Sequence, residues 1–176
     1  MEKLYTICIF TENTLGLLNR ISGIFTRRRI NIESLSVSET ERKGVSRFTV
    51  VIKSGEREKV EKIVKQIRKI IEVLAVFGYE DKDLVYNEIA FFKVGLENGP
   101  QAKLLLEEYS GAKLLSEEGN CLVIETAGTE EEIYGFFNML KPLGILEFVR
   151  SGRIALSKNE EGLVHYLPEA EWEYNI

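Results

Sequence analysis

The chain is poor in the residues that most often carry catalysis, metal binding and covalent cross-links. Its 176 residues include two cysteines, one histidine, one tryptophan and three prolines. Cys8 and Cys121 lie in separate apolar, strand-like stretches, so we expect two buried reduced thiols and neither a disulfide nor a metal site. His165 lies in the C-terminal segment, and we interpret it as incidental to any chemistry.

Long hydrophobic runs are also missing. No apolar stretch approaches the roughly 20 residues needed to span a bilayer, and the N-terminus lacks the apolar core of a signal peptide. Hydrophobic residues make up 44% of the chain and charged residues 29%, which is typical of a globular protein in water. The composition therefore predicts a cytoplasmic protein with no membrane partner, built as one domain or as two of roughly 80 to 90 residues.

Motifs of catalysis and of nucleic-acid binding are absent as well. The chain has no phosphate-binding glycine loop, no nucleophile motif and no cluster of metal ligands. An RNA-binding module would need several stacking aromatics in its third strand, but the segment 45–51 has only Phe48. An acylphosphatase-like enzyme would need an arginine and an asparagine around a phosphate loop, and we find no such arrangement. We therefore predict no catalytic residue, no metal, no cofactor and no nucleic-acid partner in this chain.

What the chain does contain is one order of elements, repeated. Periodicity in residues 1–78 predicts strand 4–10, helix 17–28, strands 32–39 and 46–53, helix 56–70 and strand 73–77. In residues 87–158 it predicts strand 88–96, helix 99–111, hairpin 113–126, a helix with Thr129 and Glu132 as capping box, and strand 145–156. Both orders are βαββαβ. The predicted fold class is α+β, with two ferredoxin-like domains, a charged linker at 79–86 and an acidic, aromatic tail at 159–176.

The most informative motif follows the first strand. Asn13-Thr14-Leu15-Gly16-Leu17-Leu18 forms a polar loop that leads into a helix opening on glycine. A helix start without a side chain offers free backbone N–H groups and lets a carboxylate approach closely. The alternative interpretation is that Gly16 only eases a tight turn from strand to helix.

A second short motif, Asn31-Ile32, opens the next strand. Asn13 and Asn31 can each donate and accept hydrogen bonds, which suits the ammonium and the carboxylate of one ligand. Leu15, Leu17 and Ile32 would then line a pocket for an aliphatic side chain. The two motifs together predict a binding site for a small apolar amino acid.

These residues resemble the small regulatory subunits of acetolactate synthase (acetohydroxyacid synthase), over about Tyr5 to Lys158. The segments that carry the resemblance are Glu12-Asn13 with Gly16 and Leu18, residues 31–37, Ala127-Gly128-Thr129, and residues 149–157. The resemblance implies an N-terminal ACT domain, a C-terminal ferredoxin-like domain, and a homodimer joined through the helices and edge strands of the ACT domains. Half-covered sheets with free edges also favour pairing through residues 1–78.

The resemblance also implies a regulatory function. Valine, or the related leucine or isoleucine, would bind between the paired ACT domains and mediate feedback inhibition. The chain itself would lack catalysis and would activate a large catalytic subunit that uses thiamine diphosphate, Mg²⁺ and FAD. The candidate effector-binding residues are then Asn13, Leu15, Gly16, Leu17, Leu18, Asn31 and Ile32, with Asn19 and Ser38 at the margin.

One departure from the family pattern concerns the turn between helix and strand. The family usually has a glycine shortly before Asn-Ile, where this chain has Arg28-Arg29-Ile30. The geometry of that turn, and with it the affinity for an effector, is therefore open. A free-standing ACT-domain sensor that serves another enzyme of amino-acid metabolism is the alternative function.

Overall fold

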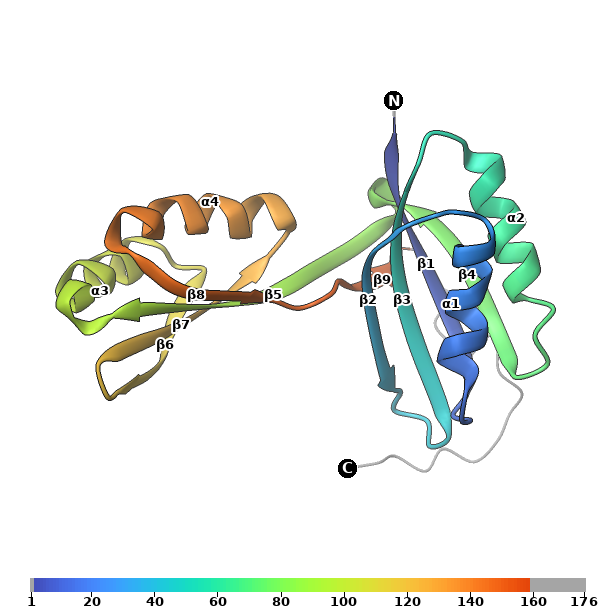
Figure 1. Ribbon diagram of the computed structural model, residues 1–176, viewed down its shortest axis with the longest axis horizontal. Helices are drawn as coiled ribbons and strands as arrows, with labels where there is room; N and C mark the ends of the chain where they lie inside the picture. The colour runs from blue at the N-terminus through green and yellow to red at the C-terminus, as the bar shows by residue number, and fades with distance from the viewer. Residues whose placement is uncertain (1, 159–176) are drawn as a thin grey trace. The chain divides into compact units, whose positions relative to one another are not determined.

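The chain forms two compact units, each with its own sheet and core, in a computed structural model that describes residues 2–158 (Figure 1). The first unit comprises residues up to Val85 together with residues 155–158, and the second comprises Tyr86–Ile154. No helix within residues 2–158 is long and apolar enough to cross a membrane.

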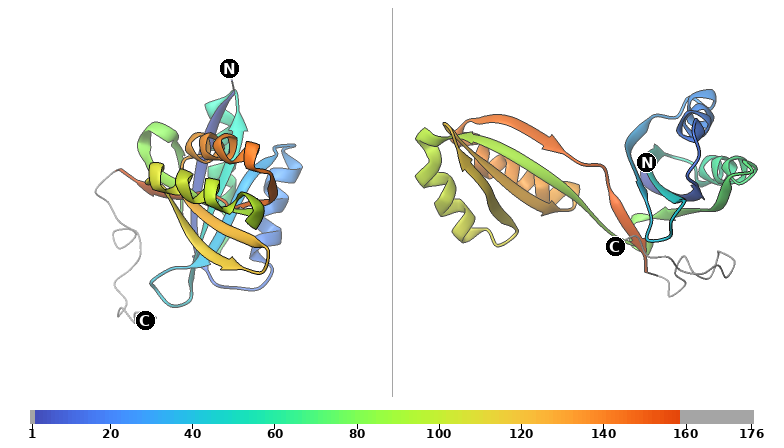
Figure 2. Two further views of the ribbon diagram at one scale, coloured as in Figure 1. Left: turned by 90° about the vertical axis from the view of Figure 1, so that its left-hand side faces the viewer. Right: turned by 90° about the horizontal axis from the view of Figure 1, so that it is seen from below.

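The first unit has the predicted order βαββαβ. Its elements are β1 (Lys3–Glu12), α1 (Leu17–Arg27), β2 (Ile32–Glu39), β3 (Val45–Ser54), α2 (Arg57–Ile67) and β4 (Val73–Glu80). The strands form an antiparallel sheet in the order β2-β3-β1-β4, so β2 and β4 are its edges. Figure 2 shows α1 and α2 on the same face of this sheet.

The core of the first unit lies between that face and the two helices. Alternate residues of β1, namely Tyr5, Ile7 and Ile9, point toward the helices because side chains alternate across a strand. The helices meet them with apolar residues at helical spacing, as predicted: Leu17, Ile21, Ile24 and Phe25 from α1, and Val60, Ile63 and Ile67 from α2. The opposite face also contains buried residues, among them Thr6 and Cys8 of β1.

The second unit repeats the order with β5 (Leu84–Gly95), α3 (Gly99–Glu108), β6 (Ala112–Glu118), β7 (Cys121–Gly128), α4 (Glu130–Leu140) and β8 (Ile145–Arg150). Its sheet has the order β6-β7-β5-β8. The predicted capping box begins α4, since the Thr129 side chain accepts from the Glu132 N–H and Glu132 accepts from the Thr129 N–H. Phe92 and Phe136 pack edge to face in its core, with ring centroids 5.4 Å apart. The predicted fold class, α+β with two ferredoxin-like units, is confirmed.

The stretch 79–86, which the sequence predicts to be a linker, contains regular elements, and the two units divide within it, between Val85 and Tyr86. Residues 79 and 80 end β4, a short 3₁₀ turn η1 (Asp81–Asp83) follows, and β5 begins at Leu84. Two further short 3₁₀ turns, η2 (Leu96–Asn98) and η3 (Lys141–Leu143), flank α3 and α4. Of the charged residues in 79–86, Glu80 and Asp81 are partly buried, and Lys82 and Asp83 are exposed in η1.

The prediction of one continuous strand at 145–156 is wrong. The segment divides into β8 and a separate β9 (Ile154–Ser157), which pairs with β5, and residues 155–158 belong to the first unit. The break follows from residues 151–153, where the Ser151 N–H donates to the Ile89 carbonyl and the Arg153 guanidinium stacks 3.7 Å over the Tyr86 ring. Both cysteines are free, but only Cys8 is buried and Cys121 is partly exposed. The tail 159–176, with His165, lies outside the described residues.

Candidate effector-binding site

The loop that leads from β1 into α1 is held by backbone hydrogen bonds. The Asn13 N–H donates to the Gly44 carbonyl oxygen at 2.8 Å, and the Glu12 N–H donates to the Glu72 carbonyl oxygen at 2.9 Å. These bonds fasten the loop to the β2–β3 hairpin on one side and to the turn before β4 on the other. These backbone hydrogen bonds therefore fix the position of the loop that contains the predicted motif.

Gly16 combines the conformation of a turn with the openness of an anion-binding helix start. It has φ 80° and ψ −4°, in the left-handed region that glycine adopts without strain. No side chain caps α1 at this end, and its first turn carries no acidic residue, so the first N–H groups of the helix lack a capping acceptor. No heavy atom lies within 4 Å of the position that a Cβ would take. Both interpretations of Gly16 therefore fit the geometry.

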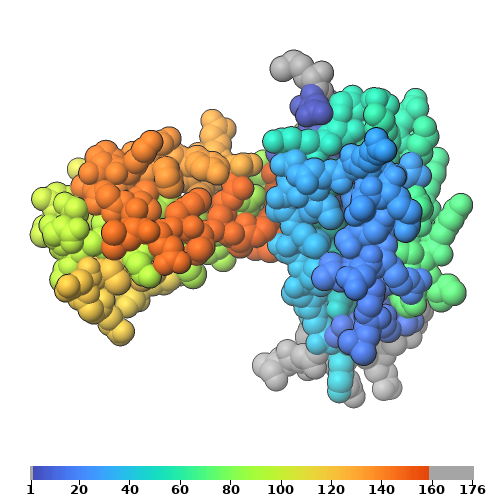
Figure 3. All heavy atoms as spheres, viewed as in Figure 1, coloured from blue at the N-terminus to red at the C-terminus, as the bar shows by residue number. Residues whose placement is uncertain are grey.

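The three leucines of the motif differ in exposure. Leu17 is 2% exposed and packs in the core, so only its backbone can reach a ligand. Leu15 is fully exposed and Leu18 is 45% exposed. Ile71, in the turn fastened to this loop, is 91% exposed. Large apolar side chains exposed together at one end of a unit are characteristic of a surface that a partner or a ligand covers, and in the space-filling view the α1 segment lies on the open surface (Figure 3).

The second predicted motif lies at the opposite end of the sheet. Ile32 is in register with Ile52 of β3, and Ile52 is in register with Tyr5 of β1. The loop instead follows Glu12, seven residues further along β1, where the partner on β3 is Val45. At ~3.3 Å per residue, the two ends are about 23 Å apart. Within one subunit, a small ligand at Gly16 cannot also contact Asn31 and Ile32.

The local surroundings of the remaining candidates follow from this arrangement. Asn31 is exposed just before β2, and its side-chain amide donates to the Glu33 carboxylate at 3.4 Å. Ile32 is partly buried against the core. Ser38 is in register with Arg47, so it lies toward the loop end of β2, and Asn19 is exposed in the first turn of α1.

An ion pair that no sequence pattern indicates supports the loop. Arg20 of α1 and Glu72 before β4 are joined by a hydrogen-bonded ion pair of 2.5 Å. The hydrogen bond from Arg20 lowers the pKa of the Glu72 carboxyl below its usual range. No local signal could reveal this pair, because the two residues are 52 positions apart in the sequence.

The turn after α1 contains the one unusual backbone conformation among the non-glycine residues of the described chain. Arg29 has φ 54°, in the left-handed region. It stands in the segment where the family pattern has glycine. Residues 2–158 contain no group of three or more histidine, cysteine, aspartate or glutamate side chains placed to hold a metal ion.

Two family models match the chain, one for each unit. Residues 7–75 match the AHAS small subunit-like ACT domain, and residues 87–159 match the small subunit of acetolactate synthase. The acetolactate synthase small subunit of Mycolicibacterium smegmatis is 33% identical over 160 residues, which cover 90% of this chain and 94% of that protein. That of Bacillus subtilis is 32% identical over 163 residues, with 92% and 93% covered. The crystal structure of the acetolactate synthase small subunit from Thermotoga maritima superposes on this chain with a TM-score of 0.80 and is 26% identical in sequence. The superposition covers 90% of this chain and 99% of the Thermotoga chain.

Proposed function

Since the chain belongs to the family of acetolactate synthase small subunits, we propose that it is a regulatory subunit that works as a homodimer. In this role it activates the catalytic large subunit and carries feedback inhibition by valine or a related branched-chain amino acid. The family model that matches residues 87–159 supports this role over that of a free-standing ACT-domain sensor, because it extends the likeness beyond the first unit.

The observation that carries the proposal is the separation of the two binding motifs. Asn13 and Gly16 lie at one end of the first sheet, and Asn31 and Ile32 lie at the other. Both motifs can serve one ligand only if two subunits contribute. A two-fold axis supplies this arrangement, because each subunit then presents the same surface to the other.

The edge strand β2 provides a route to such a pairing. It is the outermost strand of its sheet, so one row of its backbone groups is open to a second copy. If two β2 strands pair antiparallel about a two-fold axis, the beginning of one strand lies beside the end of the other. Asn31 and Ile32 of one subunit then approach the loop end of the partner, where Gly16 opens α1.

The chemistry of the combined site suits a branched-chain amino acid. The uncapped N–H groups at the start of α1 attract the carboxylate, and the positive end of the helix dipole adds to the attraction. Asparagine side-chain oxygens accept from the ammonium group. Leu18 and the partner's Ile32 offer apolar contact to the branched side chain.

Complementation between subunits tests the shared site. We would co-express two differently tagged variants, Gly16→Asp and Asn31→Ala, isolate the heterodimer with both tags, and titrate it with valine by calorimetry. Each variant homodimer is expected not to bind, whereas the heterodimer has one site with both ends intact and should bind at half the wild-type stoichiometry.

The matched control is a heterodimer of Gly16→Asp with Asn13→Ala. Both substitutions affect the same end of the site, so each of its two sites keeps one defect and no binding should return. Return of valine binding in neither heterodimer, or in both, would contradict a site shared between subunits.

A separate experiment tests the regulatory role. The chain should capture a thiamine-diphosphate enzyme from source lysate and stimulate its acetolactate formation in a valine-sensitive way. Capture of a different enzyme would favour the free-standing sensor.

A further inference from the structure

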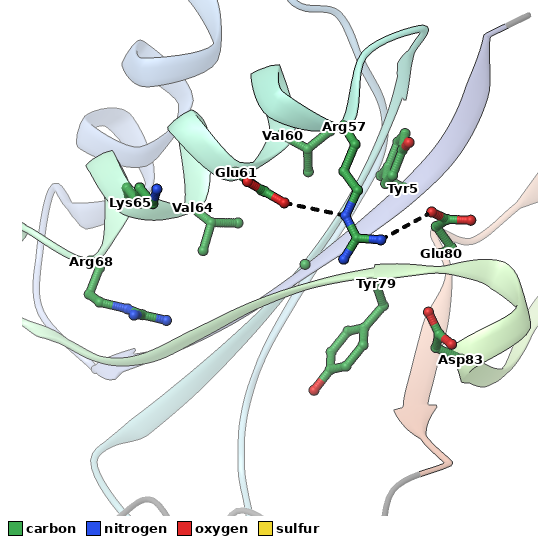
Figure 4. Close-up of a pocket in the computed structure, with 11 residues that line it drawn as sticks. Tyr5, Arg57, Val60, Glu61, Val64, Lys65, Arg68, Tyr79, Glu80 and Asp83 are labelled. Atoms are coloured by element: carbon green, nitrogen blue, oxygen red, sulfur yellow. Dashed lines mark hydrogen bonds and ion pairs between the residues drawn. The ribbon is translucent and has the colours of Figure 1, made fainter.

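A cavity lies in the first unit, between α2 and the edge strand β4 (Figure 4). Its volume is about 220 Å³, and none of its lining residues belongs to α1, to the loop before α1 or to β2. It is therefore separate from the proposed effector site. Its floor is apolar and includes Val60, Val64 and Gly78.

Gly78 lets Val60 and Val64 of α2 pack closely against β4. A Cβ added at Gly78 would lie 3.2 Å from Cγ2 of Val64 and 3.6 Å from Cγ1 of Val60. A side chain at this position would therefore crowd the two valines. Because Gly78 is exposed and bare, a ligand can rest directly on the backbone of β4 and on the valine side chains.

Two of the carboxylates that line the cavity, Glu61 and Glu80, are already paired with cations. Arg57 lies 3.3 Å from Glu61 and 3.7 Å from Glu80. Glu80 also has Lys3 at 3.4 Å and Lys82 at 3.6 Å, so three cations surround one carboxylate. The field in the cavity is consequently favourable to an anion rather than to a cation.

Two further cations line the cavity without a carboxylate partner among the described residues, Lys65 and Arg68. Lys65 lies in the last turn of α2 and Arg68 directly follows the helix, at the same end of the cavity (Figure 4). One Nη of Arg68 donates to the carbonyl oxygen of Val76 at 3.2 Å, which holds the guanidinium beside β4 while its other N–H groups remain available. An arginine held in this way next to a lysine is prepared to receive a carboxylate.

We propose that this cavity binds a small aliphatic carboxylate. The ligand's carboxylate contacts Lys65 and Arg68, and its aliphatic body rests on Val60, Val64 and the backbone of Gly78. The volume is below the roughly 300–1,000 Å³ typical of pockets for drug-sized ligands, so the ligand has the size of a single amino acid or oxo acid. Asp83 also lines the cavity, but at the end away from Lys65 and Arg68, so the proposed contacts do not include it (Figure 4).

The test is an NMR titration of the full chain carrying Gly16→Asp, so that the proposed effector site is disabled. The probes are 3-methyl-2-oxobutanoate and valine, which share a carbon skeleton and differ in the ammonium group. We expect saturable shifts of the Gly78 and Val64 amides. Shifts with both probes support recognition of the carboxylate and the aliphatic body that the probes share, and shifts with valine alone contradict it. Absence of saturable shifts with either probe overturns the proposal, whatever valine does in the protein with Gly16 intact.

Two variants and a control locate the ligand. Lys65→Gln should weaken binding about tenfold, because a charge-assisted hydrogen bond is lost. Lys62→Gln removes the same charge from the same helix at a residue that does not line the cavity, and it should leave the affinity unchanged. Gly78→Ala should also weaken binding, because the added methyl group displaces Val64 and Val60, which line the cavity. Equal weakening by both lysine variants, or full affinity in Gly78→Ala, would place the ligand on the outer surface and contradict the proposal.

Discussion

The backbone N–H of Ile30 donates to the carbonyl oxygen of Phe25 at 3.1 Å, five residues back, and so ends α1. The Arg29 N–H donates in parallel to the carbonyl oxygen of Thr26 at 3.0 Å. Together the two bonds form a Schellman motif, with Arg29 in the left-handed position and Ile30 packed against the core. The turn therefore has arginine in a left-handed conformation, which L-residues avoid.

The first prediction is that Arg29→Gly stabilises the protein. Glycine adopts the left-handed conformation without the steric cost that arginine has there, so the substitution removes that cost. The greater freedom of glycine in the unfolded chain offsets part of this gain. We expect the free energy of unfolding in urea to rise by about 1 kcal/mol. Arg28→Gly is the control, since Arg28 has φ −93° and should gain nothing. Equal effects of the two changes would mean that Arg29 is not strained.

The second prediction concerns effector binding. Gly16→Asp should abolish the binding of valine in calorimetry, because its carboxylate repels that of the ligand and occupies the open space at the helix start. Gly119→Asp is the matched control, since Gly119 also has a positive φ, 61°, with nothing within 4 Å of its Cβ position. Valine binding that survives Gly16→Asp, or is lost in both variants, would move the site away from Gly16.

The third prediction is that β2 forms the interface of a dimer. Val37 on β2 is 45% exposed, and a lysine on an edge strand opposes its pairing with another strand. Val37→Lys should therefore convert the dimer that we expect for the wild type into a monomer in sedimentation. Leu115→Lys places the same change on β6, the edge strand of the other sheet, at 44% exposure, and should leave the dimer intact. A wild-type monomer at micromolar concentration would contradict the homodimer itself.

The fourth prediction concerns pH and the second unit. Glu88 is 4% exposed, and its Oε2 accepts no hydrogen bond within the described part of the chain, although Nε of Arg150 lies 3.2 Å away. Burial raises the pKa of the Glu88 carboxyl, and the charge of Arg150 offsets only part of that rise. The folded state therefore holds this proton more tightly than the unfolded state, whose pKa is about 4.3.

The stabilisation contributed by protonated Glu88 is complete below that unfolded value and is lost as the pH rises through the folded-state pKa. The free energy of unfolding of the wild type minus that of Glu88→Gln should consequently fall as the pH rises from about 4 to about 8. Glu117→Gln, which removes an exposed carboxylate paired with Lys103, serves as the reference for loss of a surface ion pair. A wild-type minus Glu88→Gln difference that rises with pH would contradict the raised pKa.

The fifth prediction is reciprocity between effector and catalytic subunit. A pocket built from two subunits makes affinity sensitive to their relative orientation, so valine would shift an existing equilibrium between activating and non-activating dimers. With a coupling of roughly 1–3 kcal/mol, inhibition is partial, and addition of the large subunit must weaken valine binding by the same factor. Identical valine affinity with and without the large subunit, in a complex that valine still inhibits, would exclude this mechanism.

Several features of the fold could be predicted because they depend on residues close together in the sequence. The apolar residues of α2 recur at 60, 63 and 67, and helical periodicity places them on one face whatever they pack against. The capping box of α4 needs only Thr129 and Glu132, three positions apart. The sequence left the geometry of the turn before Asn31 open, and the structure shows Arg29 there with a positive φ of 54°.

Other features depend on contacts that cross the chain, and only the folded structure reveals them. The registers of β1 and β2 on β3 place Asn13 and Asn31 at opposite ends of one sheet. From the sequence alone, both residues were expected in one pocket. The ion pair between Arg20 and Glu72 joins two residues that are distant in sequence. The interruption between β8 and β9 lies at Arg153, which is buried in the folded chain. The physical reason is that periodicity and capping act over a few residues, whereas register and burial are set by packing of the whole unit.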